Sequence, residues 1–337
     1  MSATTTATAE PAHSTPSGAA APLPHVTIRP ARSGDLLAIA HLWAAAFMDD
    51  SLVGETVHPH RAEYPHDVYL GSLWSLRPKY WDYRCVLDIA VISAQQVDKY
   101  VDRHCAGVVR AGNDVPDVLS REDREAVNDV AKVTTGSGDV VVGLAQWTRY
   151  GDGEGVRKRL PGWWDPRNLM LPLTTKAMAL HERIWPNRAS DPAQRDIFSR
   201  SLPHWIHLFA DPARAECWNL ATCAVHPCFQ GQGIGRKLVA VGKARADAER
   251  VCAVLTSSQG KDGFYQKGCG FEEQFGDMCA GEGNPMGILR GRGGLMYWYW
   301  PEGVKTPSTR ETRAEGPSGD VPDEVQEEVA QGAPIIA

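Results

Sequence analysis

Hydrophobic residues form a series of short, nearly continuous runs along the chain. These runs lie at residues 25–30, 86–92, 139–147, 220–225, 251–255 and 295–300. Uninterrupted apolar runs of this length are typical of strands buried on both faces of a sheet, whereas the alternating run at 25–30 is typical of an edge strand. The pattern therefore predicts six strands.

Between these runs, apolar residues recur at helical spacing. Such segments lie at 36–47, 98–130, 175–185, 196–209 and 236–246, and Pro203 must kink or interrupt the fourth of them. Strands that alternate with helices predict an α/β fold. The stretch 74–83 is rich in aromatic residues, which we expect to pack in a lid, and 276–294 is rich in glycine and predicts a long loop.

The two ends of the chain have a different composition from the middle. Residues 1–24 are mainly Ala, Thr, Ser and Pro, and residues 303–337 are rich in Pro, Ser, Glu and Gly. Such segments bury too little apolar surface to fold, so we expect disordered tails around one domain at 25–302. Residues 1–24 also lack the charged and apolar regions of a signal peptide. Within the domain, about 154–215 is predominantly helical in pattern.

A glycine cluster lies between the strand at 220–225, which His226-Pro227 ends, and the helix that follows. Without side chains, the backbone N–H groups there can approach an anion closely, and the start of a helix favours negative charge. This pattern predicts a pyrophosphate-binding loop. Its residues are Gln230, Gly231, Gln232, Gly233, Ile234 and Gly235, followed by Arg236.

Two common nucleotide motifs do not fit this loop. A dinucleotide-binding fingerprint needs G-x-G-x-x-G, and the spacing of Gly231, Gly233 and Gly235 differs by one residue. An NTPase phosphate loop ends in Gly-Lys-Ser/Thr, whereas this helix opens with Arg236-Lys237-Leu238, which supplies no hydroxyl for magnesium.

The order Gln-x-x-Gly-x-Gly, between a strand and a helix, resembles motif A of the GNAT family of acetyl-CoA-dependent N-acetyltransferases. Downstream, Phe264-Tyr265-Gln266-Lys267 with Gly270-Phe271 resembles motif B of that family, with one residue more than usual between the tyrosine and the glycine. The run VVGLAQW at 141–147 is similar to a strand in the wall of the acyl cleft. The helical stretch at 154–215 resembles an insertion found before motif A in fungal members.

The resemblance implies a mixed, twisted β-sheet flanked by helices and an acetyl transfer from acetyl-CoA to an amine in a direct ternary complex. It also implies that the loop and Arg236 hold the pyrophosphate. The pantetheine arm would pair like an extra strand with the backbone of three residues that precede the loop. These are Cys223, Ala224 and Val225.

The catalytic roles are assigned on simple chemical grounds. Tyr265 is our candidate general acid, because a phenol with a pKa near 10 keeps its proton at neutral pH, although a purely structural hydroxyl is the alternative. Glu216 is the carboxylate nearest to the motif A strand and is our candidate base, with His204 and His207 as alternatives through water.

Asp49 and Asp50 follow the first helix, where the family has a loop that borders the acceptor pocket. Carboxylates in that loop would attract an ammonium group. The alternative is that the two acids only form a solvated turn.

Charge and composition narrow the choice of partners. A net charge of −6 argues against general binding to nucleic acid or anionic membranes, and no apolar run reaches the 18 residues of a membrane span. Eight cysteines without a CxxC pair indicate reduced thiols in a cytoplasmic protein. His58, His60 and His66 lack a fourth ligand in the pattern, so we expect no metal.

We therefore expect a monomer or homodimer that acetylates a small-molecule amine, in resistance or secondary metabolism. One alternative is a non-catalytic acyl-CoA-binding or scaffold protein on the same fold, because the motif A strand lacks a carboxylate. A nucleotide-dependent oxidoreductase is a second alternative, which the glycine spacing disfavours.

Overall fold

Seven strands form one sheet in the order β1-β2-β3-β4-β5-β7-β6. The computed structural model describes residues 25–97 and 118–304, so nearly all of the two predicted tails and most of the predicted helix at 98–130 lie outside the described residues. All neighbouring strands are antiparallel except β4 and β5, which are parallel. The strands are β1 (Thr27–Pro30), β2 (Cys85–Ser93), β3 (Asp139–Tyr150), β4 (Cys217–Val225), β5 (Cys252–Ser258), β6 (Glu273–Asp277) and β7 (Gly293–Tyr299).

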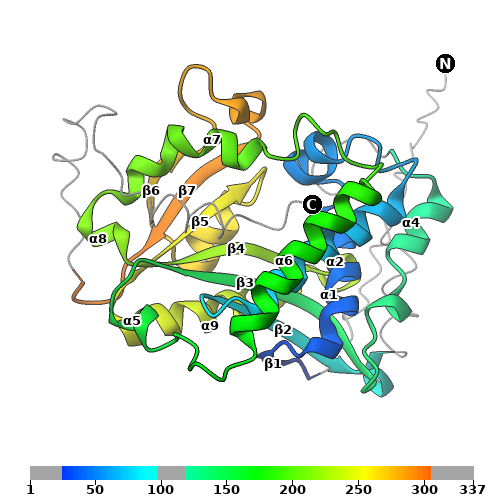
Figure 1. Ribbon diagram of the computed structural model, residues 1–337, viewed down its shortest axis with the longest axis horizontal. Helices are drawn as coiled ribbons and strands as arrows, with labels where there is room; N and C mark the ends of the chain where they lie inside the picture. Colours follow the sequence, from blue (N-terminus) through cyan, green and yellow to red (C-terminus); the bar gives the residue numbers. More distant parts are fainter. Residues whose placement is uncertain (1–24, 98–117, 305–337) are drawn as a thin grey trace, which may run out of the picture.

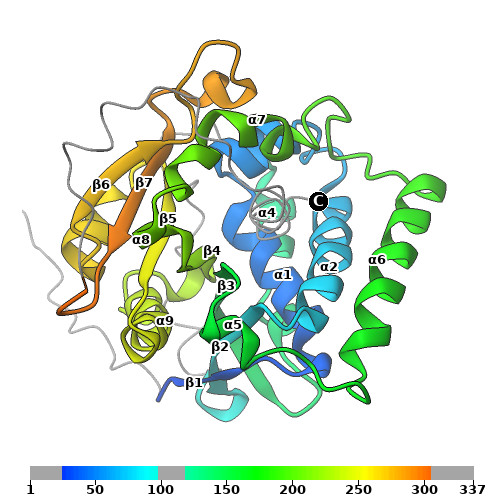
Figure 2. The same cartoon turned by 60° about the vertical axis from the view of Figure 1, so that its left-hand side comes forward.

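Helices cover both faces of this sheet (Figures 1 and 2). Helices α1 and α2 lie together on one face, and α9 packs against β3 and β4 on the other. Helix α6 lies outside α2, at the edge of the molecule in Figure 2. The helices are α1 (Leu36–Phe47), α2 (Pro65–Trp81), α4 (Arg121–Val127), α5 (Glu154–Arg157), α6 (Arg167–Ile184), α7 (Ile197–Trp205), α8 (Pro212–Ala215) and α9 (Ile234–Glu249).

The core contains several fully buried tryptophans, among them Trp43 of α1 and Trp147 of β3. Gly242 of α9 packs directly on the Trp147 indole, so closely that a Cβ atom there would overlap the ring. This close approach explains why α9 carries a glycine in the middle of a helix, where glycine is otherwise unfavourable. A second apolar cluster, which includes Trp205, Phe209 and Trp298, lies under α7.

All six predicted strands are present, with ends that differ by at most three residues, and the helix at 36–47 has the predicted bounds. The predicted helices at 236–246 and 196–209 are α9 and α7, and α7 contains Pro203 and continues into a 3-10 turn. The glycine-rich stretch 276–294 is mostly loop but contains a short helical segment, η8 (Pro285–Leu289).

Three elements differ from the prediction. The aromatic stretch at 74–83 belongs to a regular helix, α2, which holds Pro78 in its last turn. Helix α6 begins eight residues before the predicted start at 175 and includes Pro172 in its second turn. Strand β6 was missed, because its five residues carry no apolar run.

The observed sheet is mixed and has helices on both faces, which confirms the predicted α/β class. Among the described residues, no single helix is long and apolar enough to cross a membrane. Only a pair bent by 87°, Ser33–Phe47 with Ser51–Val57, satisfies the length and composition limits jointly.

Candidate functional site

The two parallel strands at the centre of the sheet separate at their carboxyl ends. Pairing between β4 and β5 runs from Cys217–Cys252 to Leu220–Leu255 and then stops. Both strands continue beyond this point, to Val225 and Ser258, without pairing with each other. The sheet therefore opens into a gap whose walls carry unpaired backbone groups on the β4 side.

Some backbone N–H and C=O groups of β4 point into this gap and can pair with a ligand there. The β3 register jumps from Trp147–Leu220 to Gln146–Thr222, so Ala221 is an extra, bulged residue at the point where the strands separate. The His226 N–H donates to the Val142 carbonyl of β3 at 3.0 Å. Because the hydrogen-bonding direction alternates along a strand, Cys223 and Val225 direct their backbone groups away from β3, toward the gap.

This alternation corrects part of the predicted pantetheine site. The backbone of Cys223 and Val225 faces the gap as expected, but the backbone of Ala224 faces β3 and forms part of the sheet. The Val225 carbonyl accepts a hydrogen bond from Gln230 Nε2 at 3.0 Å, which ties the predicted phosphate loop to the end of β4.

The glycine loop leads directly into α9. Gly231 and Gly233 have φ angles of 76° and 77°, a left-handed conformation that disfavours other residues. A Cβ atom at either position would meet nothing within 4 Å, so the space in front of the loop is open. Gly233 is the N-cap of α9 and supplies no side-chain cap, which leaves the N–H groups of the first turn available to an anion.

The remaining loop residues divide by exposure. Gln230 and Arg236 are exposed and Gln232 is half-buried, whereas Ile234 and Gly235 are buried. A side chain at Gly235 would press on the Phe264 ring at 3.2 Å, so this glycine permits close packing against η7 (Phe264–Gly268). The loop can therefore offer its backbone and the Arg236 guanidinium to a diphosphate.

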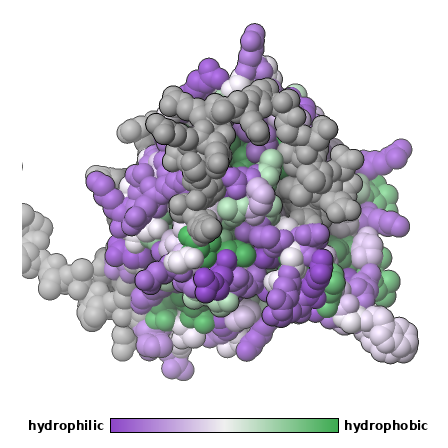
Figure 3. All heavy atoms as spheres, turned by 90° about the vertical axis from the view of Figure 1, so that its left-hand side faces the viewer, coloured by the Kyte–Doolittle hydropathy of each residue, from purple (hydrophilic) through white to green (hydrophobic). Residues whose placement is uncertain are grey.

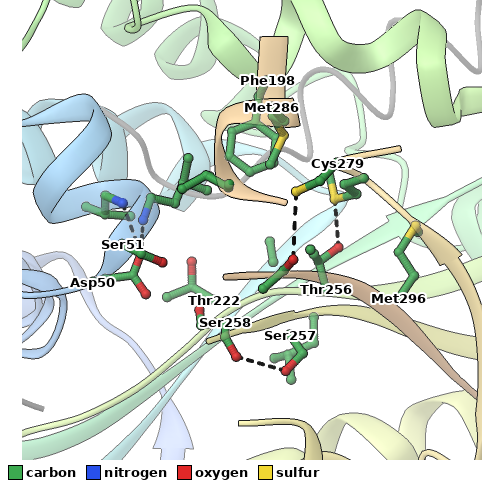
Figure 4. A pocket seen from close by; sticks show the side chains of 18 of the residues that line it. Asp50, Ser51, Phe198, Thr222, Thr256, Ser257, Ser258, Cys279, Met286 and Met296 are labelled. Carbon is green, nitrogen blue, oxygen red and sulfur yellow. Dashed lines mark hydrogen bonds between the residues drawn. The ribbon is translucent and has the colours of Figure 1, made fainter. Parts of the chain in front are cut away.

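A cavity of about 110 Å³ lies beside the gap, between β4, β5, β7 and α7 (Figure 4). Aromatic and thioether side chains supply much of the apolar wall, and polar residues such as Ser51, Asn219, Thr256 and Arg292 also line it. The aromatic and thioether residues include Trp43, Phe47, Phe198, Trp205, Phe209, Met278, Met286 and Met296. Such a lining predicts an occupant with an apolar body.

Asp50 is the one carboxylate among the residues that line this cavity. Its Oδ1 accepts hydrogen bonds from the N–H groups of Leu52 and Val53, both at 2.9 Å, and so caps the short segment η2 (Ser51–Val57). Burial raises the pKa of Asp50 above the usual 3.8, while these two N–H groups oppose the rise. The carboxylate is therefore fixed in position at the cavity wall.

Asp49 has different surroundings. It forms an ion pair with Arg124, with Oδ2 at 2.5 Å from Nη1, and it does not line the cavity. Of the two acids predicted for the acceptor pocket, the structure places only Asp50 there.

Two polar groups on the cavity wall have no hydrogen-bond partner among the described residues. They are the hydroxyl of Thr222 on β4 and the indole N–H of Trp205 on α7, in residues only 4% and 6% exposed. A buried polar group without a partner is costly, so both indicate a ligand that hydrogen-bonds in the cavity. No sequence pattern pointed to either residue.

Tyr265 lies in η7, half-buried, with its ring in edge contact with Phe264. Burial raises the pKa of its phenol well above 10, and the nearby Cys223 thiol and Asp50 carboxylate add to this rise. The Tyr265 hydroxyl is therefore within electrostatic reach of both the gap and the cavity acid. Burial also raises the pKa of Cys223 to about 12, so that thiol stays neutral.

The structure does not place Glu216 at the site. This residue precedes β4 at the end far from the loop, where it pairs with Arg149 at 2.6 Å and accepts from the Gly153 N–H at 2.7 Å. It does not line the cavity, and neither do His204 and His207. The sequence favoured Glu216 by its proximity along the chain, but a strand of nine residues separates it from the loop.

The predicted histidine cluster is also dispersed. His58 is buried, with Nδ1 2.8 Å from the Val53 carbonyl oxygen, whereas His60 and His66 are exposed. Across residues 25–97 and 118–304, no three His, Cys, Asp or Glu side chains lie close enough to hold a metal ion.

Comparison with known proteins agrees with this geometry over part of the chain. A protein-family model described as "Acetyltransferase (GNAT) domain" matches residues 204–273, which contain β4, the glycine loop, α9, β5 and η7. No curated protein matched the chain.

Five chains of solved structures also match, and two of them are as follows. One is described as histone acetyltransferase HPA2 and related acetyltransferase from Corynebacterium glutamicum, with 15% identity and a TM-score of 0.43 over 84% of this chain and 99% of that one. The other is a mosquito arylalkylamine N-acetyltransferase like 5b, with 8% identity and a TM-score of 0.33 over 81% and 98%.

The family match covers the part of the chain that forms the gap, the loop and the tyrosine segment. The mixed sheet, separated at β4 and β5, is the α/β fold of GNAT acetyltransferases. Residues 204–273 therefore match a GNAT acetyltransferase domain, and this match supports an acyltransferase of the N-acetyltransferase type.

Proposed function

We propose that this chain transfers an acetyl group from acetyl-CoA to the amine of a small molecule with an apolar body, through a direct ternary complex. The observation that carries the proposal is the position of Asp50. Among the described residues, it is the single carboxylate on the cavity wall beside the gap between β4 and β5, and the Arg292 guanidinium on the same wall is paired with Glu55.

The chain offers a continuous path for the acyl donor. The open loop at Gly231 and Gly233, with Arg236, would hold the pyrophosphate, and the backbone of Cys223 and Val225 would pair with the pantetheine arm. Acetyl-CoA supplies the activated acetyl group when bound. A backbone donor freed by the bulge at Ala221 would stabilise negative charge on the acyl oxygen.

Asp50 would bind the acceptor as its ammonium ion and take up the proton that must leave before the nitrogen can attack. A carboxylate with a raised pKa is a better proton acceptor than an ordinary aspartate. The hydroxyl of Thr222 and the indole N–H of Trp205 would hydrogen-bond polar atoms of the two substrates.

Tyr265 would return a proton to the departing thiolate. Its phenol keeps its proton throughout the neutral range, because its pKa lies well above 10. The neighbouring Cys223 thiol is also protonated there, so no competing anion lies next to the phenol.

Release of free thiol from acetyl-CoA, measured over a panel of amines, tests this function. We expect turnover with amines that carry a compact apolar or aromatic body, and little with polyamines or with lysine in a peptide. Acetyl-CoA binding without turnover of any amine would favour the alternative, a non-catalytic acyl-CoA-binding protein.

A further inference from the structure

Helix α6 carries an apolar stripe that nothing in the described part of the chain covers. None of its 18 residues is buried. Leu169, Leu173, Leu180 and Ile184 are 68%, 53%, 59% and 52% exposed. Tryptophans flank both ends of the helix, with Trp163 and Trp164 before it and Trp185 after it, at 78%, 79% and 64% exposure.

Packing against α2 does not account for this helix. The contact includes a stack of Trp74 on His181, with ring centroids 4.1 Å apart, and a groove of about 800 Å³ separates other parts of α2 and α6. The half-buried residues of α6, such as Thr174, Met178 and His181, face α2, whereas Leu169, Leu173 and Leu180 lie on another side of the helix. Ile184 lies at the rim, because it also lines the groove between the two helices, as does Trp185. A helix of this length is marginal in water without a buried face, so a further partner is expected for the stripe.

The spacing of the four stripe residues is the same from either end of the helix. Its residues follow at intervals of four, seven and four, and small Ala177 lies at the middle. When a second copy of α6 lies antiparallel, Leu169 faces Ile184 of that copy and Leu173 faces Leu180. Such self-complementarity is the property that a two-fold symmetric interface requires.

We propose that α6 forms a homodimer interface in which two copies pair antiparallel about a two-fold axis beside Ala177. Trp163 and Trp164, exposed just before the helix, extend the apolar surface at each end of the paired helices. The four aliphatic residues with Trp163 and Trp164 expose on the order of 800 Å², about what each partner buries in a standard interface.

Figure 3 shows one face of the molecule, where most residues are hydrophilic and hydrophobic residues are visible at the right-hand edge and in smaller groups at the centre and lower left. The interface is also separate from the proposed active site, because α6 contributes no residue to the cavity around Asp50. Loss of the dimer and loss of acetyl transfer are therefore distinguishable.

Sedimentation velocity of the full chain between about 1 and 100 µM tests the proposal. We expect a dimer that Leu173→Glu with Leu180→Glu converts to a monomer with an unchanged circular dichroism spectrum. Leu37→Glu with Ile288→Glu is the matched control, because these residues are equally exposed, at 56% and 57%, but lie elsewhere. The control variant should remain dimeric.

Hydrogen exchange of residues 167–184 in the unaltered chain gives a second readout that needs no variant. Protection should increase with protein concentration, and added salt should strengthen the dimer, because Lys176 at the edge of the stripe lies near its copy across the axis. A monomer at 100 µM, a Leu173→Glu/Leu180→Glu variant that remains dimeric, or a monomer that binds anionic vesicles through α6 would each overturn the proposal.

Discussion

Asp49 and Asp50 are adjacent in the chain but have different roles in the structure. Asp49 neutralises Arg124, and Asp50 caps η2 and lines the cavity. The sequence predicted that acids after the first helix would border the acceptor pocket. It could not separate the two residues, because their surroundings come from η2 and α4, which neither composition nor periodicity locates next to them.

At Asp50, exchange for Asn should lower kcat/KM for amines by about 10²-fold or more, since the ammonium loses its counter-charge and proton acceptor. Acetyl-CoA binding should not change. Asp49→Asn is the matched control, because it removes the same charge one residue away from the cavity. Equal losses in the two variants would show that Asp50 has no special role.

The pH dependence of the unaltered enzyme follows from the raised pKa of Asp50. Because the carboxylate must be ionised to bind the ammonium, kcat/KM should fall on acidification at a pH above 3.8.

The raised pKa of Asp50 in the folded state also affects stability. The stabilising effect of Asp50 is complete below pH 3.8 and is lost as pH rises through the folded-state pKa. Asp50→Asn should therefore not lower the free energy of unfolding at neutral pH, as urea titration would show.

Tyr265 gives a second test at this scale. Tyr265→Phe removes only the hydroxyl, and we expect kcat to fall by about 10²-fold while the KM for acetyl-CoA changes little. In the unaltered enzyme, no loss of rate that depends on this phenol should occur below pH 10. An unchanged kcat in Tyr265→Phe would assign the tyrosine a structural role only.

Among the elements, α9 shows how a local pattern and a tertiary contact combine. The apolar spacing predicted the helix, and the glycines before it predicted an open N-terminus, both of which the structure confirms. No local pattern explains the glycine at position 242. The Trp147 indole on β3, which is distant in the sequence, leaves no room for a side chain there.

Replacement of Gly242 by Ala should therefore destabilise the protein, although Gly→Ala inside a helix usually stabilises it by about 1 kcal/mol. We expect the free energy of unfolding to fall by roughly 1–3 kcal/mol, because the new methyl group overlaps the buried ring. Gly263→Ala is the control, since Gly263 has helical φ and ψ angles and open space around it. A more stable Gly242→Ala variant in urea titration would contradict this packing.

The elements that the sequence missed have a common physical cause. Helix α2 alternates apolar and polar residues without a clear stripe, and β6 is too short and polar to give a strand pattern. Both obtain their structure from neighbours, α2 from α1 and β6 from β7, so local propensity alone does not reveal them.

At the scale of the whole molecule, function depends on one interruption of the sheet. The separation of β4 from β5 after Leu220 and Leu255 brings together the glycine loop, the backbone groups of β4 that face the gap, and the cavity that Asp50 lines. The sequence predicted the loop because its chemistry is local. It did not predict the cavity, because residues from Trp43 to Met296 meet there only in the folded sheet.

Glu216 shows that closeness in the sequence does not predict closeness in the folded protein. Nearness along the chain favoured it as the base, yet a strand carries it away from the loop to the buried Arg149. The wall of the cavity is formed instead by residues such as Asp50 and Trp205, which come from segments before and after β3.

The affinity for acetyl-CoA, measured by titration calorimetry in the unaltered protein and in Gly233→Asp, tests whether the glycine loop binds the pyrophosphate. The substitution places a negative charge in the open space before α9, where the pyrophosphate would lie. Gly138→Asp is the matched control, because Gly138 has a similar φ of 80° and open surroundings in a distant turn.

We predict micromolar binding in the unaltered chain and in Gly138→Asp, and at least a 100-fold loss in Gly233→Asp. Equal affinities in all three folded proteins, or no binding to the unaltered chain, would contradict the assignment of this loop and the acetyl transfer built on it.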